Sequence, residues 1–208
     1  MTSTSAGSIS LGDGIELRPL RPEHADEFLA HIDRGREFVG RFIRLPDLVT
    51  DAGSAHAFLS GYARQAEADT GRLDGIWADG LLVGGVLLRS MNVAEGVAEV
   101  GCRLEPAAVG RGLVTRGARA LIRWAIEERG IHRVEWRVAP QNTASITVAR
   151  RLGMRRDGVL RERYLHRDTR YDAEVWSPPR APGGSGARRR RPPVRDHRRV
   201  HRDPGRVV

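Results

Sequence analysis

The sequence predicts an α+β fold in which helices flank a mostly antiparallel central sheet. Short segments of alternating apolar and polar residues, typical of half-buried strands, are separated by turn dipeptides such as Asp79-Gly80. Another segment repeats apolar residues at helical spacing, including Val114, Ala118 and Ala125. With 208 residues and no internal repeat, the chain is long enough for one domain with a sizeable core.

The expected elements are arranged in order along the chain. Alternating residues predict a first strand over 15–20, and Pro22, with acidic residues close behind it, marks the start of a helix. Asp79-Gly80 predicts a tight hairpin. The remaining elements are a helical region over 54–67, strands over 76–78 and 82–89, a reversal at 92–96, a helix running to residue 128, a strand over 134–138, and a closing antiparallel pair over 159–165 and 171–176.

A glycine-spaced loop precedes the strongest predicted helix, which Gly130 ends. Unpaired backbone N–H groups and the helix dipole make such a helix start an anion site, and glycines let the backbone approach the ligand. The sequence therefore predicts a phosphate-binding loop after the strand that ends near Glu105. Its residues are Val109, Gly110, Arg111, Gly112, Leu113, Val114 and Thr115.

Three kinds of phosphate loop can be compared with this segment. A nucleoside-triphosphate P-loop needs Lys and Ser or Thr after its last glycine, but Leu113 and Val114 stand there and the chain contains no lysine. A dinucleotide loop needs a third Gly or Ala where Thr115 stands, and an acid at the end of the next strand, where the chain has Val138-Ala139-Pro140. The remaining candidate is a pyrophosphate cradle for coenzyme A.

In this form the loop resembles the acyl-CoA site of the GNAT N-acetyltransferase superfamily, whose pattern is Gln or Arg, two residues, Gly, one residue, then Gly or Ala. Residues 98–106 resemble the strand of that fold that splays open beside the pantetheine arm. Residues 142–154 resemble its next helix, and residues 157–162 the strand after that helix. The resemblance covers residues 14–176 and is closest to the branch that acetylates N-terminal serine or alanine of ribosomal proteins. It implies the GNAT acyl-CoA N-acyltransferase fold.

The resemblance also implies which residues bind the acetyl-CoA co-substrate. Besides the loop, these are Cys102 and Leu104 on the splayed strand, and Asn142 and Ser145 near the thioester. The sequence departs from the pattern at Ala107, where Gln or Arg is usual. Because the cradle is built from backbone N–H groups, we expect a weaker grip on phosphate, with Arg111 or Arg116 compensating electrostatically.

Three side chains are candidates for chemistry, and each has a structural alternative. The Ser145 hydroxyl either protonates the departing thiolate or positions a water, or it caps the start of its helix. Glu99 is either the general base or a salt-bridged strand residue. Tyr164 stands where the ribosomal branch can carry a second acid; it either donates a proton to the thiolate or packs on the closing strand.

These assignments predict an acetyl-CoA-dependent N-acetyltransferase that transfers the acetyl group directly to a primary amine. No acyl-enzyme is expected, because the only thiol, Cys102, is placed in a core strand. The scattered histidines indicate no metal site. The leading acceptor is a protein N-terminus. A small amine (polyamine, amino-sugar or aminoglycoside) and a non-catalytic acyl-CoA-binding protein remain as alternatives, and a homodimer stays open.

The net charge of +9 is concentrated at one end of the chain. Ten arginines and two aspartates fall in residues 177–208, so residues 1–176 carry only about one net positive charge. This Arg-, Pro- and Gly-rich tail is expected to be disordered; it is either an RNA-docking arm or a non-functional extension, and nucleic acid is expected nowhere else. Residues 1–13 are expected to be flexible. Without a leader or an apolar span, the protein is expected in the cytoplasm, away from the membrane.

Overall fold

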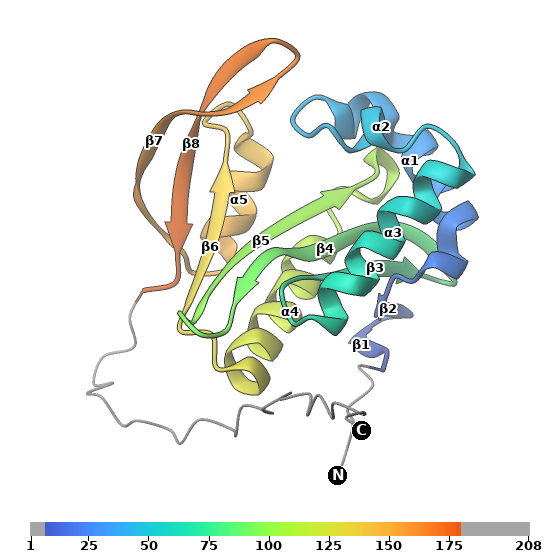
Figure 1. Cartoon of the computed structure of the whole chain (residues 1–208), viewed down its shortest axis with the longest axis horizontal. Coiled ribbons are helices and arrows are strands. Elements are labelled where there is room, and N and C mark those ends of the chain that lie inside the picture. Colours follow the sequence, from blue (N-terminus) through green and yellow to red (C-terminus); the bar gives the residue numbers. More distant parts are fainter. Residues whose placement is uncertain (1–6, 180–208) are drawn as a thin grey trace, which may run out of the picture.

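A computed structural model describes residues 7–179. Its centre is one eight-stranded sheet in the order β1-β2-β3-β4-β5-β6-β8-β7 (Figure 1), in which every neighbouring pair is antiparallel except the parallel pair β5–β6. The predicted α+β class is confirmed. The strands are β1 (Ile9–Gly12), β2 (Ile15–Pro19), β3 (Arg72–Ala78), β4 (Leu81–Asn92), β5 (Val97–Leu104), β6 (Arg133–Val138), β7 (Arg155–His166) and β8 (Thr169–Ser177).

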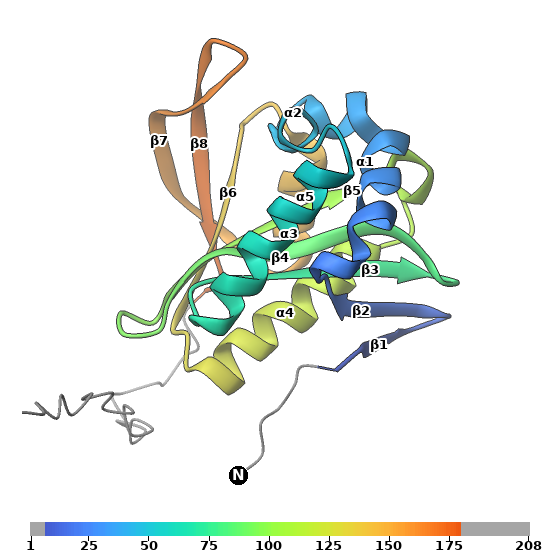
Figure 2. The same cartoon turned by 45° about the vertical axis from the view of Figure 1, so that its right-hand side comes forward.

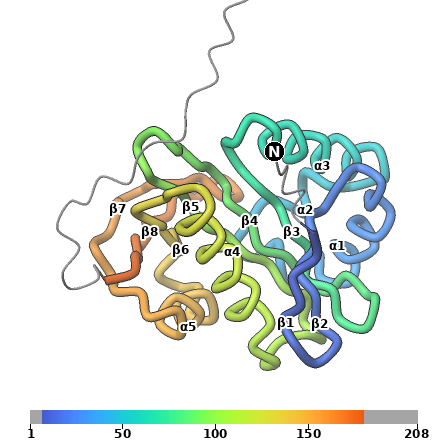
Figure 3. Tube along the Cα trace, turned by 90° about the horizontal axis from the view of Figure 1, so that it is seen from below, coloured from blue at the N-terminus to red at the C-terminus, as the bar shows by residue number. Residues whose placement is uncertain are grey.

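Helices cover both faces of the sheet, as Figure 3 shows. One face carries α1 (Ala25–Gly40), α2 (Leu45–Leu48) and α3 (Ala52–Glu67), and the other carries α4 (Leu113–Arg129) and α5 (Thr143–Arg151). Two short 3-10 turns, Pro22–His24 and Pro106–Ala108, precede α1 and the loop before α4.

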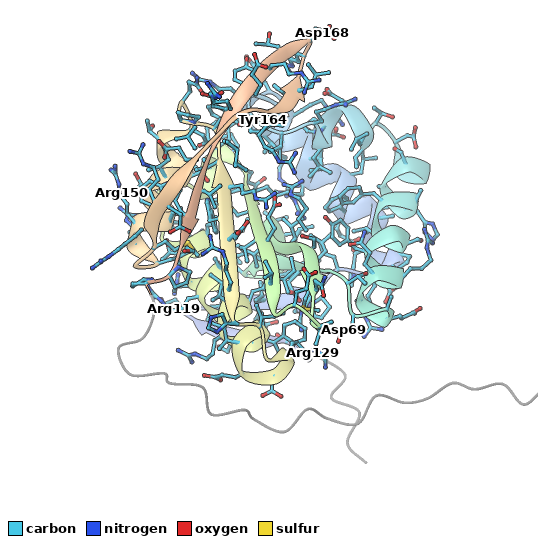
Figure 4. All side chains as sticks on the ribbon, turned by 60° about the vertical axis from the view of Figure 1, so that its left-hand side comes forward. Asp69, Arg119, Arg129, Arg150, Tyr164 and Asp168 are labelled. Atoms are coloured by element: carbon cyan, nitrogen blue, oxygen red, sulfur yellow. The ribbon has the colours of Figure 1, made fainter. Side chains whose placement is uncertain are left out.

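Each face of the sheet has its own hydrophobic core. The larger core packs α4 and α5 on the sheet and includes Leu121 and the fully buried Trp136. The smaller core packs α1 and α3 through Phe28 and Leu59, neither of which is exposed. Because side chains alternate between the faces of a strand, the same strands supply both cores. An ion pair between Asp69 and Arg129 joins the segment after α3 to the end of α4 (Figure 4).

Local sequence signals placed several element boundaries correctly. Asp79 and Gly80 both have positive φ, +50° and +80°, as the hairpin between β3 and β4 requires. Gly130 ends α4 in the left-handed conformation, with φ +67°. At the start of α3, Asp51 accepts a hydrogen bond from the Ser54 backbone N–H at 2.7 Å, and this cap sets the helix start slightly before the predicted one.

The boundaries of the folded unit differ from the expected 14–176 at both ends. Residues 9–12, in the stretch that the sequence predicts to be flexible, form β1, which pairs with β2 at one edge of the sheet (Figure 2). Arg116 of α4 holds this edge by donating to the Leu11 carbonyl and to Asp13, each at 3.0 Å. At the other end, β8 continues to Ser177. The rest of the predicted tail, from residue 180 on, lies outside the described residues.

The parallel pair β5–β6 separates partway along its length. The two strands pair from Val97 with Arg133 to Val100 with Trp136. Beyond Val100, β5 pairs only with β4, while β6 turns to β8. Within the described residues, the β6-facing edge of residues 101–104 therefore has no strand partner, and its backbone groups are free to bind a ligand.

Candidate active site

The glycine loop has the backbone geometry of an anion cradle. Gly110 and Gly112 adopt φ of +88° and +70°, and a Cβ on either residue would meet no atom within 4 Å. Gly112 is the N-cap of the 17-residue helix α4, and no side chain of the described part of the chain caps this end. The first N–H groups of α4 therefore face open space together with the positive end of the helix dipole.

Only one of the two arginines expected to reinforce this cradle is available. Arg116 is held by Leu11 and Asp13, so it binds the edge hairpin rather than the loop opening. Arg111 is exposed and lies between the two glycines. The guanidinium of Arg111 is thus the charge that can support the backbone amides in place of a residue at Ala107.

A cavity of about 360 Å³, here called the transfer cavity, opens where β5 and β6 separate. It brings together five of the predicted site residues, Glu99, Cys102, Asn142, Ser145 and Tyr164. Leu104 and the glycine loop do not line this cavity. Leu104 is the last residue of β5, and the glycine loop begins at Val109, directly after the turn Pro106–Ala108.

Of the two polar residues at the start of α5, Asn142 caps the helix and Ser145 points its hydroxyl into the cavity. The Asn142 side chain caps α5, because its Oδ1 accepts from the Ser145 backbone N–H at 3.1 Å. The Ser145 hydroxyl is not a cap. Its Oγ accepts a hydrogen bond from Trp136 Nε1 at 2.9 Å, which leaves the hydroxyl hydrogen free to be donated into the cavity that Ser145 lines.

Glu99 is held in ion pairs. Its carboxylate lies 3.0 Å from Arg89 Nε and 3.2 Å from Arg137 Nη1, and the side chain is 17% exposed. One guanidinium group lies against each carboxylate oxygen, so both oxygens of Glu99 are engaged in ion pairs. The structural alternative considered for this residue matches the geometry.

Tyr164 lies on the hairpin β7–β8, below the tip that Asp168 marks (Figure 4). Its ring stacks on Tyr171 with centroids 6.0 Å apart, and its hydroxyl has no hydrogen-bond partner among residues 7–179. Burial, assisted by the neighbouring Tyr171, raises the pKa of Tyr164 above its usual value. The phenol therefore stays protonated at neutral pH and can act as a donor.

Cys102 is partly buried: it packs against the larger core and also lines the transfer cavity. Burial raises the pKa of its thiol to about 12, against the weaker opposing influence of Arg103 and Arg89. Since the thiolate is the nucleophilic form, this thiol is unreactive at neutral pH.

The cavity also has walls that sequence reasoning missed. Phe42, Ile43 and Arg44 reach it from the segment between α1 and α2, and Leu165 and His166 reach it from the end of β7. His166 Nε2 bonds to the Gly40 carbonyl at 3.0 Å and therefore donates, while Nδ1 is enclosed without a partner in the described chain. No local signal marks these residues, because the segments that carry them are far apart in the sequence.

Comparison with known proteins agrees with this geometry. Residues 15–155 match the family described as acetyltransferase (GNAT) domain. The chain is 31% identical over 156 residues to the probable N-acetyltransferase YjcK of Bacillus subtilis (strain 168), a match that covers 73% of this chain and 86% of that protein. The chain therefore belongs to the GNAT acetyltransferase family, and the family resemblance found in the sequence is confirmed.

One further relative and one solved structure extend the comparison. The putative ribosomal N-acetyltransferase YdaF of Bacillus subtilis (strain 168) is 25% identical over 168 residues, covering 80% of this chain and 92% of that protein. The solved structure of RimL, a ribosomal L7/L12 alpha-N-protein acetyltransferase in complex with coenzyme A, has a TM-score of 0.78 at 17% identity and covers 82% of this chain and 96% of that chain. At that identity the likeness shows the fold alone.

Two further structural findings concern metal binding and membrane-spanning helices. Among residues 7–179, no three His, Cys, Asp or Glu side chains are grouped so that they could hold a metal ion. None of the helices in this part of the chain has the length and apolar character needed to cross a membrane.

Proposed function

We propose that this GNAT acetyltransferase transfers the acetyl group of acetyl-CoA to the α-amine of a protein N-terminus. The observation that carries the proposal is the lack of a free base in the described lining of the transfer cavity. Glu99 is its one carboxylate and is paired with two arginines, and the second nitrogen of His166 is enclosed. An acceptor used there must supply an amine that is already partly unprotonated.

This requirement favours α-amines over alkylamines. An α-amino group has a pKa of about 7.7–8.0 and an alkylamine such as lysine about 10.4, so at pH 7 roughly a tenth of the former and about one in 2,500 of the latter is neutral. The guanidinium groups of Arg44 and Arg163, which also line the cavity, favour the neutral amine further by like-charge repulsion. Polyamines, whose binding would call for carboxylates in the cavity, fit this site poorly.

The cradle would hold the pyrophosphate of acetyl-CoA on the N–H groups of Gly110 to Thr115, with Arg111 beside them. From there the pantetheine arm would run along the free edge of β5, past Leu104 and Cys102, into the transfer cavity. This path places the thioester between β5 and α5. Support for it comes from the open space at both loop glycines and from the unpaired strand edge.

The amine nitrogen attacks the thioester carbonyl carbon, the C–S bond breaks, and the amine proton passes to solvent. The departing thiolate needs a proton, and two hydroxyls of the cavity can supply it. Tyr164 is protonated and has no other partner in the described chain, and Ser145 is oriented by Trp136 so that its hydrogen can be donated. We assign Tyr164 as the proton donor and Ser145 as the group that positions the leaving sulfur.

Two matched variants of α4 test the cradle. Gly112→Asp places a negative side chain at the N-terminus of the helix, where it repels phosphate and blocks the amides, so acetyl-CoA affinity should fall by at least about 100-fold. Gly130→Asp has the same backbone strain and equally open surroundings at the opposite end of α4, and affinity should not change. The measurement is isothermal titration of each full-length variant with acetyl-CoA.

The acceptor is tested by initial rates with serine-first and alanine-first peptides, spermidine and an aminoglycoside. Turnover of the peptides alone supports the proposal, whereas turnover of spermidine alone would replace the peptide with a small amine. Tight binding of acetyl-CoA without turnover of any amine would make the chain a non-catalytic acyl-CoA-binding protein. Equal affinity of the Gly112→Asp and Gly130→Asp variants for acetyl-CoA would show that the glycine loop does not bind the pyrophosphate.

A further inference from the structure

A second cavity adjoins the transfer cavity. This tip groove, of about 730 Å³, lies between α1 and the tip of the hairpin β7–β8, and His166 lines both spaces. The groove provides room beyond the reacting amine for further residues of an acceptor chain. Its chemistry should therefore indicate which side chains an acceptor carries after its N-terminal residue.

The two linings are strongly positive. Residues 1–176 as a whole carry only about one net positive charge. The positive charge around the two cavities is therefore not explained by the average composition. Eight arginines oppose three carboxylates around the two cavities. They are Arg34, Arg36, Arg41, Arg44, Arg89, Arg137, Arg163 and Arg167, with Asp33, Glu37 and Glu99.

Half of these arginines already take part in ion pairs. Arg34 pairs with Glu105 at 2.7 Å, Arg36 pairs with Asp33, and Arg89 and Arg137 share Glu99. The other four are exposed and have no ion-pair or hydrogen-bond partner in the described part of the chain. These are Arg41, Arg44, Arg163 and Arg167.

The four unpaired arginines come from two distant segments that meet at this opening. Arg41 and Arg44 stand after α1, while Arg163 and Arg167 belong to the hairpin. The bond between His166 and the Gly40 carbonyl joins the two segments, and the Arg167 guanidinium lies over Gly40, 3.4 Å from where a Cβ would be. Arg41 and Arg167 line the tip groove and Arg44 and Arg163 line the transfer cavity, and His166 joins the two spaces.

We infer that the acceptor is an acidic N-terminal peptide, with carboxylates in the residues that come after the reacting amine. This inference rests on the proposed function and adds the chemistry of the chain behind the amine. Guanidinium groups bind carboxylates in paired hydrogen bonds, and a positive entrance raises the rate of encounter with acidic partners. The same field repels cationic acceptors.

The test compares three hexapeptides that begin with serine and differ at three later positions: aspartate, asparagine of the same shape, or lysine. We expect kcat/KM for the aspartate peptide to exceed that for the asparagine peptide by about tenfold at low salt, with the gap closing at high salt. In the double variant Arg163→Gln/Arg167→Gln the preference should disappear. Arg155→Gln, at the far end of the same strand and outside both linings, should keep it.

The outcomes separate this inference from the proposed function. Equal turnover of the aspartate and asparagine peptides overturns the inference and leaves the N-terminal acetyltransferase intact. A preference that survives in the double variant overturns the assignment to these arginines. Free aspartate and phosphoserine are assayed as small anionic acceptors. If they are acetylated and no peptide is, the acceptor is a small anionic amine and the proposed peptide acceptor is wrong.

Discussion

At the residue scale, the transfer cavity depends on what each polar side chain already bonds to. Ser145 accepts from Trp136 and so retains a free hydrogen, whereas Glu99 is shared between two guanidinium groups. Tyr164, which lines the same cavity, has a pKa raised by burial, and its hydroxyl has no hydrogen-bond partner in the described chain. These contacts favour the two hydroxyls over the carboxylate as proton donors in the proposed reaction.

Tyr164→Phe tests this assignment. The variant keeps the ring that stacks on Tyr171 and removes only the hydroxyl, so kcat should fall by about 100-fold while the affinity for acetyl-CoA stays the same. Tyr171→Phe is the matched control from the same stacked pair; Tyr171 lines the tip groove rather than the transfer cavity, so loss of its hydroxyl should leave kcat unchanged and can alter only the KM for the acceptor. Steady-state rates that agree within about twofold for the wild type and Tyr164→Phe would remove Tyr164 from the chemistry.

At the element scale, helix starts position the site. The first turn of α4 begins after Gly112, and the first turn of α5 is held by Asn142, whose side chain bonds the backbone N–H of Ser145. The cap on α5 therefore fixes the residue whose hydroxyl faces the cavity. Stability and catalysis are coupled at this one position.

Asn142→Ala removes the cap. Loss of an N-cap costs about 1 kcal/mol, which for a chain of this size lowers Tm by roughly 3 °C, and kcat should fall because Ser145 is less well fixed. Asn142→Asp keeps an acceptor at the helix N-terminus and should retain the wild-type Tm. Scanning calorimetry and steady-state rates on both variants measure the two effects; an unchanged Tm in Asn142→Ala would contradict the capping role.

At the scale of the whole molecule, a buried polar cluster lies between the sheet and α1. His31 is fully buried, and Arg103 is 5% exposed and stacks over Phe28 at 4.7 Å. Burial, with Arg103 and Arg34 nearby, lowers the pKa of His31 to about 2. The Glu105 carboxylate, 3.9 Å from Nδ1, does not reverse this effect because Arg34 already binds it.

This cluster predicts a loss of stability in acid. His31 stays neutral in the folded state and gains a proton on unfolding below its ordinary pKa of about 6.5, so the unfolded state binds more protons there. Between about pH 6 and about pH 4 the free energy of unfolding should fall by up to about 1.4 kcal/mol per pH unit on account of His31 alone. Urea titrations at several pH values measure this slope.

The matched variants are His31→Gln and His56→Gln. The first removes the buried titratable group and should make the dependence on pH shallower. The second removes an exposed histidine on the neighbouring helix α3 and should leave the slope unchanged. Identical slopes in the wild type and His31→Gln would show that this imidazole is accessible to protons in the folded protein.

Most of the fold could be predicted because its signals are local. The alternation in β6, the helical spacing in α4 and the turn at Asp79-Gly80 each occupy a few consecutive residues. The edge strand β1 was missed because residues 9–12 are short and lie in a stretch rich in Ser and Gly; tertiary contacts with β2 and Arg116 stabilise it as a strand. Strand propensity is weak without such neighbours.

By itself, the sequence determined the family and the order of the elements, and it predicted the cradle, since each depends on backbone conformations that neighbouring residues specify. The tertiary structure alone decided that Glu99 is ion-paired, that the Ser145 hydroxyl faces the cavity, and that Arg44 and Arg163 stand at one entrance. Those properties depend on contacts between residues far apart in the chain. These contacts form only because the helices on both faces of the sheet and the hairpin β7–β8 pack around the point where β5 and β6 separate.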